Sequence, residues 1–70
     1  MINDESLYYD TAAKAALARR HRDESTYRFH RDWFHQARML ETAEDRAAAD
    51  AAWERGYKDN TPVRKPEYFL

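Results

Sequence analysis

The placement of glycine and proline constrains this chain more than any other feature. Its single glycine is Gly56, and its two prolines are Pro62 and Pro66. The sequence before Gly56 is rich in Ala, Arg and Glu, which favour helix. β-branched residues are scarce, and no segment alternates with the period of a strand. We therefore predict an all-α fold, a small bundle of two or three helices over residues 1–60, with an extended C-terminal tail over residues 61–70.

Polar residues define the start of the first helix and its junction with the second. Asn3 or Asp4 could accept hydrogen bonds from the first backbone amides, so the first helix is predicted to begin there and to end near Arg20. Residues 19–25 contain no apolar side chain. Two arrangements stay open: one long helix with a solvated middle, or a break near Asp23, which would then cap the second helix.

The second helix is predicted over residues 24–40 and the third over residues 43–57. Thr42 precedes two acidic residues in the pattern of an N-cap followed by an acidic first turn. Beyond the third helix, the two prolines prevent further helix. We expect the apolar end of the chain, residues 67–70, to fold back onto the bundle, with a docking peptide as the alternative, because a small core gains most from extra cover.

The apolar residues predict a thin core of aromatic rings packed on alanine. The 70 residues include twelve Ala and ten aromatics but only four Leu, one Ile and one Val. A domain of this size buries only about 60% of the surface of its unfolded chain. The absence of cysteine removes disulfides as a source of stability. We therefore expect a second copy or a partner to complete the core, which makes a homodimer one expected form.

The second predicted helix is amphipathic, with an aromatic face centred on Trp33. At about 100° per residue, one broad face collects Phe29, His30, Trp33, Phe34, Ala37 and Leu40. A basic ridge on the other side collects Arg28, Arg31, His35 and Arg38, and we expect it to be the most exposed part of this helix. We expect the core or an interface to include Phe29, Trp33, Phe34 and Leu40, together with Trp53 and Tyr57 of the third helix.

The segment HRDWFH, residues 30–35, invites a metal-site interpretation that its spacing does not favour. His30 and His35 are five residues apart, which places them about 140° apart on a helix, whereas metal-binding pairs on helices are three or four residues apart. The segment is better explained as part of an amphipathic helix. We expect neither a metal nor another cofactor.

The charges form blocks, although the net charge is only −1. From Lys14 to Arg38 seven basic residues face three acidic ones, and acidic stretches flank this block on both sides. The candidate partner-binding residues are Arg19, Arg20, Arg22, Arg28, Arg31, His35 and Arg38. They could follow a phosphate backbone, and Tyr27 and His35 could stack on bases. We favour pairing with acidic residues, either those of the third helix, within the chain or in a dimer, or those of a partner protein, because a chain of nearly zero net charge is poorly suited to a long polyanion.

Several classes of function are disfavoured by missing motifs. The chain has neither a nucleophile elbow nor a glycine-rich phosphate loop, so we expect no enzymatic activity. It also lacks an apolar stretch long enough to span a membrane and a secretory signal. We expect a soluble cytoplasmic protein-interaction factor, of the type of phage or mobile-element accessory proteins that inhibit or redirect a host macromolecular complex. A nucleic-acid-binding helical module and a self-assembling structural subunit are the alternatives.

One short motif carries a resemblance to a known family. The segment AAWERGY, residues 51–57, resembles the A-x-x-x-G-Y turn of small ribosome-associated proteins such as the ribosome modulation factors. The match covers seven of the 70 residues and implies no functional residue. A glycine between aromatics near a helix end can also serve as a packing position or a C-cap.

Overall fold

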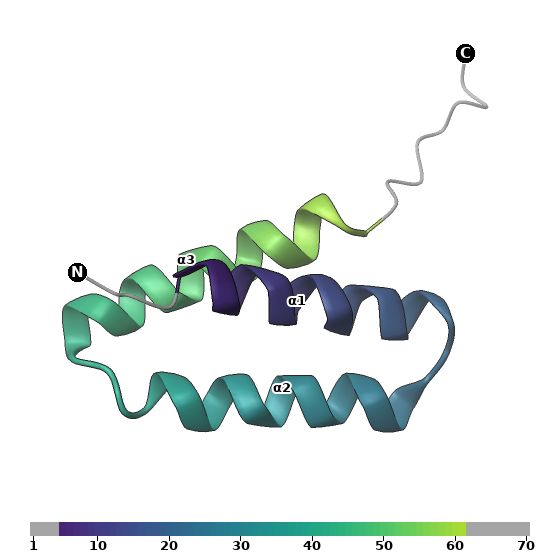
Figure 1. The fold of residues 1–70 in the computed structure, drawn as a ribbon, viewed down its shortest axis with the longest axis horizontal. Helices are drawn as coiled ribbons and strands as arrows, with labels where there is room; N and C mark the ends of the chain where they lie inside the picture. Colours follow the sequence, from purple (N-terminus) through teal and green to yellow (C-terminus); the bar gives the residue numbers. More distant parts are fainter. Residues whose placement is uncertain (1–4, 62–70) are drawn as a thin grey trace, which may run out of the picture.

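Three helices and two short connections make up the computed structural model, which describes residues 5–61. The helices are α1 (Glu5–Arg20), α2 (Glu24–Arg38) and α3 (Ala43–Asp59). α2 runs antiparallel to α1 and α3, which point in the same direction (Figure 1). The predicted all-α bundle is confirmed, and residues 5–61 contain no strand. The predicted tail fold-back lies outside the described residues.

α1 is the central helix, because its small residues allow both neighbours to approach closely. Ala12, Ala15 and Ala16 are almost completely buried. On the side of α3, Gly56 lies so close to α1 that a Cβ atom there would come within 3.0 Å of the Ala12 Cβ and closer still to the Tyr9 carbonyl oxygen. Of the two roles that the sequence leaves open for this glycine, the structure assigns the packing role inside α3.

Aromatic rings fill the space between α2 and α3. Phe34 is 5% exposed and stacks on Trp53 with ring centroids 4.4 Å apart. Its edge contacts Tyr8 of α1, which is 1% exposed. Trp33 is only partly buried and meets Tyr8 at 5.7 Å. The predicted core of rings on alanine is therefore present, but its buried centre on α2 is Phe34 rather than Trp33.

The first two helices are separated by a break near Asp23, which is one of the two predicted arrangements; the other was one long helix. Asp23 caps α2, and its carboxylate accepts a hydrogen bond from the Thr26 amide at 3.2 Å. The preceding Arg22 has a φ of 58°, in the left-handed region, so the chain reverses direction there. The predicted starts of the first helix at Asn3 or Asp4 lie outside the described residues.

The connection between α2 and α3 also contains a predicted cap. The Thr42 hydroxyl accepts a hydrogen bond from the Asp45 amide at 3.2 Å. α2 ends at Arg38, two residues earlier than predicted, with Met39 as its C-cap. Leu40 therefore lies in the turn and is 89% exposed. Leu40 is not part of the aromatic core. Its predicted place on the aromatic face assumed a helix that continues to residue 40, and α2 ends before it.

Candidate functional site

A cluster of two arginines around one tyrosine lies where the three helices meet. Tyr27 of α2 is half-buried. The guanidinium carbon of Arg19, from α1, lies 4.8 Å from the centre of its ring, and that of Arg31 lies 5.6 Å from the same centre. The ring of Tyr57, from α3, meets Tyr27 edge-on at 6.5 Å. These four residues are called the Tyr27 cluster below.

The Tyr27 cluster holds its guanidinium groups in place while leaving most of their hydrogen-bonding capacity unused. A guanidinium that lies over an aromatic ring is stabilised by about 0.5–1 kcal/mol at an exposed site. Its N–H groups project from the edge of its plane, where they can donate to a carboxylate or a phosphate in pairs. Among residues 5–61, Arg19 forms no ion pair, and Arg31 has only a 3.4 Å contact with its exposed neighbour Asp32.

The basic ridge predicted on α2 is divided between two environments. Arg28 and His35 are exposed, as expected for a ridge that faces away from the core. Arg31 and Arg38 are partly buried: Arg31 lies over the ring of Tyr27 on the same helix, and Arg38 reaches Asp50 on α3. The prediction that the whole ridge is the most exposed part of the helix is therefore wrong. The reason is that α2 packs on α1 along one flank and reaches α3 along the other, which the ridge borders.

Arg38 is a structural cation rather than a free one. Its Nε and Nη2 atoms donate to the two carboxylate oxygens of Asp50 on α3, at 2.5 and 2.6 Å. This hydrogen bonding holds the pKa of Arg38 above its ordinary value. The predicted pairing of the basic block with the acidic third helix is thus present at this residue. Arg38 is the member of the candidate set that is least available to a partner.

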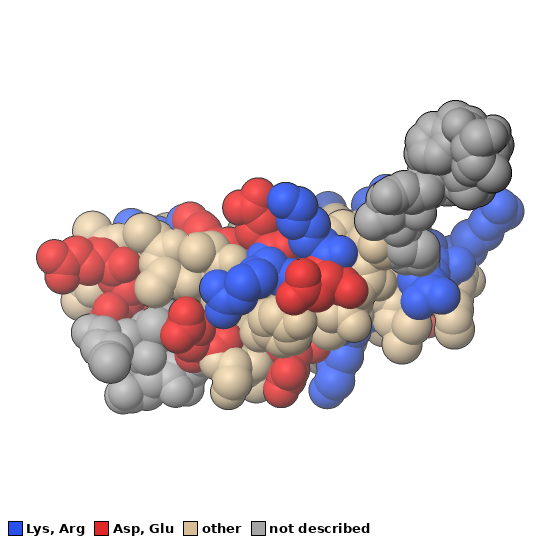
Figure 2. Space-filling model, turned by 90° about the horizontal axis from the view of Figure 1, so that it is seen from above, with Lys and Arg blue, Asp and Glu red and all other residues tan. Residues whose placement is uncertain are grey.

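The remaining cations gather at one end of the bundle. Arg19 and Arg20 end α1, Arg22 lies in the connection, and Arg28 is on the first half of α2. Within the described residues, none of these four forms an ion pair. Figure 2 shows basic side chains at this end of the molecule, acidic side chains at the end where α3 begins, and both signs between them. These four arginines and the Tyr27 cluster together are called the basic end.

The acidic residues of the basic end are partly engaged. Asp23 caps α2, and the hydrogen bond from Thr26 holds its pKa below the ordinary value. The Asp59 carboxylate accepts a hydrogen bond from the Tyr9 hydroxyl at 2.8 Å, which raises the pKa of that tyrosine. Both carboxylates stay negatively charged, so they offset only part of the charge of the five arginines at this end, Arg19, Arg20, Arg22, Arg28 and Arg31. The basic end therefore keeps an excess of positive charge.

The aromatic face of α2 continues beyond the core. Phe29 is 66% exposed, and Trp33 is partly buried beside it. The ring of Phe29 contacts the ring of His30 at 5.2 Å. Of the predicted core or interface residues, Phe34, Trp33, Trp53 and, through its ring contacts, Tyr57 belong to the packed interior of the bundle. Phe29 and Leu40 do not.

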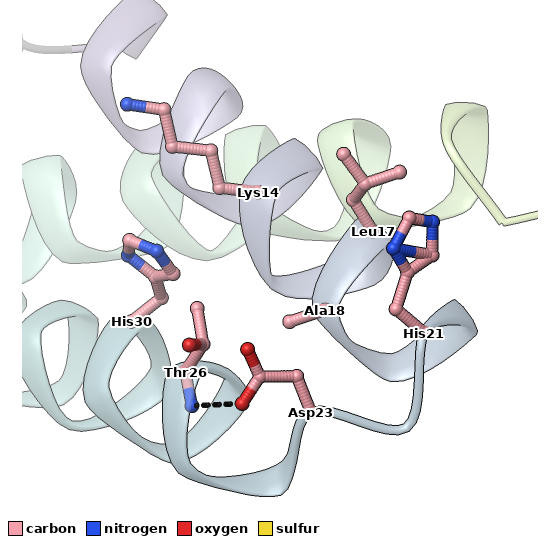
Figure 3. Close-up of a pocket in the computed structure, with 7 residues that line it drawn as sticks. All are labelled: Lys14, Leu17, Ala18, His21, Asp23, Thr26 and His30. Carbon is pink, nitrogen blue, oxygen red and sulfur yellow. Dashed lines mark hydrogen bonds between the residues drawn. The ribbon is translucent and has the colours of Figure 1, made fainter.

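His30 lies at a hollow between α1 and α2, as Figure 3 shows. Lys14 and Leu17 project from α1 on one side of this hollow, and Thr26 and His30 project from α2 on the other. Burial, and secondarily the charge of Lys14, holds the pKa of His30 below its ordinary value. Within residues 5–61, no three side chains of the metal-binding types gather closely enough to hold an ion.

The Tyr27 cluster is the feature that sequence reasoning missed. Tyr27 lies in a polar segment and was considered only as a side chain that could stack on bases. The helical spacing of Tyr27 and Arg31, four residues apart, indicates a contact between them. The approach of Arg19 depends on the break between α1 and α2, which the sequence left open.

Comparisons with known proteins return no match, whether against family models, curated proteins or solved structures. Function must therefore be inferred from the surface itself. No helix within the described part of the chain combines the length and the apolar character needed to cross a membrane.

Proposed function

We propose that this chain is a small non-enzymatic protein-interaction factor that binds an acidic surface of another protein through its basic end. The observation that supports the proposal most is the Tyr27 cluster. Two guanidiniums, those of Arg19 and Arg31, are held over one ring at a helix junction. Three further arginines of that end, Arg20, Arg22 and Arg28, form no ion pair among the described residues. Such an arrangement is preorganised to donate paired hydrogen bonds to carboxylates.

A protein surface fits the basic end better than nucleic acid does. Single-stranded nucleic acid is commonly bound by stacking its bases on aromatic side chains. The ring of Tyr27 is already covered by Arg19 and Arg31 and contacted by Tyr57. A long polyanion would also continue toward the acidic end of the bundle and be repelled there. A compact acidic surface would meet only the basic end.

The test is a binding titration by fluorescence anisotropy with two labelled probes of matched charge: an acidic peptide of Asp, Glu and Tyr, and single-stranded DNA of random sequence. We expect the peptide to bind more tightly than the DNA near physiological salt. The double substitution Arg19→Glu with Arg28→Glu should abolish peptide binding.

The matched control is Arg55→Glu, which changes one charge on α3 away from the basic end. Arg55 has a 3.8 Å contact with the exposed Glu5, and its guanidinium carbon lies 5.9 Å from the centre of the Tyr9 ring. Each such contact at an exposed site contributes about 1 kcal/mol or less, so reversal of Arg55 should leave the fold and the peptide affinity nearly unchanged. Binding of DNA that is tighter than peptide binding and falls steeply with salt would contradict the proposal and support the nucleic-acid alternative.

A further inference from the structure

α1 carries an exposed stripe that faces neither of its neighbours. Its members are Leu7, Asp10, Lys14 and Leu17, all exposed, with the two leucines 46% and 47% exposed. Their spacing is three, four and three residues, which places them within an arc of about 80° on one side of the helix. The buried residues of α1 lie on its other sides, which pack against α2 and α3. These four residues are called the α1 stripe below.

The α1 stripe is complementary to itself when two copies run in opposite directions. Rotation about a two-fold axis beside residue 12 places Leu7 of one copy opposite Leu17 of the other, and Asp10 opposite Lys14. Each apolar residue then meets an apolar residue, and each charge meets the opposite charge. This mutual relation is what a two-fold interface requires. A parallel arrangement would instead oppose like charges at positions 10 and 14.

The hollow beside Leu17 provides room for the leucine of the second copy. It has a volume of about 250 Å³ and lies between Leu17 and Ala18 on α1 and Thr26 and His30 on α2 (Figure 3). In the antiparallel arrangement, Leu7 of the second copy approaches Leu17 at this hollow. The ring of His30, which lines this hollow, contacts the exposed ring of Phe29 at 5.2 Å.

The charges of the α1 stripe are available for contacts between copies. Asp10 and Lys14 are four residues apart and could pair within one helix. Among residues 5–61, however, neither forms an ion pair. Both side chains can therefore reach across to a second copy without giving up an existing partner.

We propose that the α1 stripe is the contact surface of an antiparallel homodimer, with the hollow between α1 and α2 receiving Leu7 of the second copy. This inference goes beyond the proposed function and uses a surface that includes none of the arginines of the basic end. The α1 stripe is smaller than the roughly 800 Å² per partner of a standard interface. We therefore expect a dissociation constant on the order of micromolar rather than nanomolar.

The experiment is analytical ultracentrifugation of the full chain across a micromolar concentration series. The wild type should pass from monomer to dimer. Asp10→Lys and Lys14→Asp should each weaken the dimer about tenfold or more, because like charges then face each other at both contacts. The double variant Asp10→Lys with Lys14→Asp should restore it, since every contact again joins opposite charges.

Mixing the two single variants gives the sharpest result. In a dimer of one Asp10→Lys chain and one Lys14→Asp chain, both contacts join a lysine to an aspartate, so the mixture should dimerise although neither variant does so alone. Circular dichroism should show an unchanged fold for each, because both positions are exposed. Glu54→Lys, an exposed charge reversal on α3, is the control and should leave the dimer intact.

Three outcomes would overturn the proposal. The first is a wild-type chain that stays monomeric throughout the series. The second is a dimer that none of the stripe variants weakens, which would place the interface elsewhere. Loss of dimerisation in the single variants without recovery in the double variant or in the mixture would also contradict the antiparallel pairing.

Discussion

Replacing Gly56 by alanine tests the packing of α1 against α3, because two effects of known sign oppose each other. Alanine is favoured over glycine in the interior of a helix by about 1 kcal/mol. If the position were open, the substitution would stabilise the fold. The structure predicts the reverse, since the added Cβ would lie within 3.0 Å of the Ala12 Cβ and closer to the Tyr9 carbonyl oxygen.

The clash should exceed the gain in helix propensity. Extra atoms in a packed core typically cost about 1–3 kcal/mol, and the upper part of that range applies where the obstructing atoms belong to backbone. Backbone cannot turn aside as a side chain can, so α1 and α3 must move apart. We expect Gly56→Ala to lower the free energy of unfolding by about 1–2 kcal/mol after the propensity gain. For a domain of this size each kcal/mol corresponds to about 4–8 °C in Tm.

Thermal and urea unfolding followed by circular dichroism would measure the effect. The matched control is Ala51→Gly at an exposed position of the same helix, which should lose only the propensity, about 1 kcal/mol. A Gly56→Ala variant with a Tm above that of the wild type would refute the close approach of the two helices.

Three further predictions concern the core, a histidine and an ion pair. Phe34→Ala should cost about 3–5 kcal/mol and could unfold the domain, whereas Phe29→Ala, at a 66% exposed ring, should change Tm little. Burial lowers the pKa of His30. Neutral His30 therefore contributes to the stability of the fold above the unfolded pKa of about 6.5, and this contribution is lost as the pH falls below that value. We expect His30→Leu to make Tm less dependent on pH between about pH 7 and 5. A double-mutant cycle on Arg38 and Asp50 should give a coupling of about 1 kcal/mol or less, because the Asp50 side chain is 49% exposed and water screens its charge.

The sequence predicts the helices well because capping and breaking are local effects. Thr42 caps α3 as predicted, since a hydroxyl followed by acidic residues needs no tertiary contact to act. A break capped by Asp23 was one of two arrangements that the sequence left open, and one long helix was the other. The deciding feature is the left-handed backbone at Arg22, a conformation that a non-glycine residue adopts only rarely. Local sequence could not have selected it.

The arrangement of the surface was less predictable than the helices. Helical spacing on α2 correctly separates an aromatic face from a basic ridge. It cannot say that α3 lies beside part of that ridge and removes Arg38 from it through Asp50. It also cannot place Arg19 over Tyr27, because the contact joins two helices through a turn. Both features depend on how the helices pack, which involves residues distant in sequence.

The same limit applies to Phe29 and Phe34. Both lie on the predicted aromatic face, but only Phe34 points between α1 and α3, where Tyr8 and Trp53 enclose it. A face broader than the space between two helices must leave its margin exposed. Helical spacing alone therefore overestimates the number of buried rings in a bundle this small.

Affinity capture tests the central claim, that the basic end binds a protein, most directly. Immobilised wild-type chain, the Arg19→Glu with Arg28→Glu variant and the Arg55→Glu control would each be exposed to native lysate with and without nuclease. We predict that the wild type and the control retain the same protein after nuclease treatment and that the double reversal loses it. Equal retention by the double reversal, or loss of every bound protein after nuclease treatment, would contradict the account.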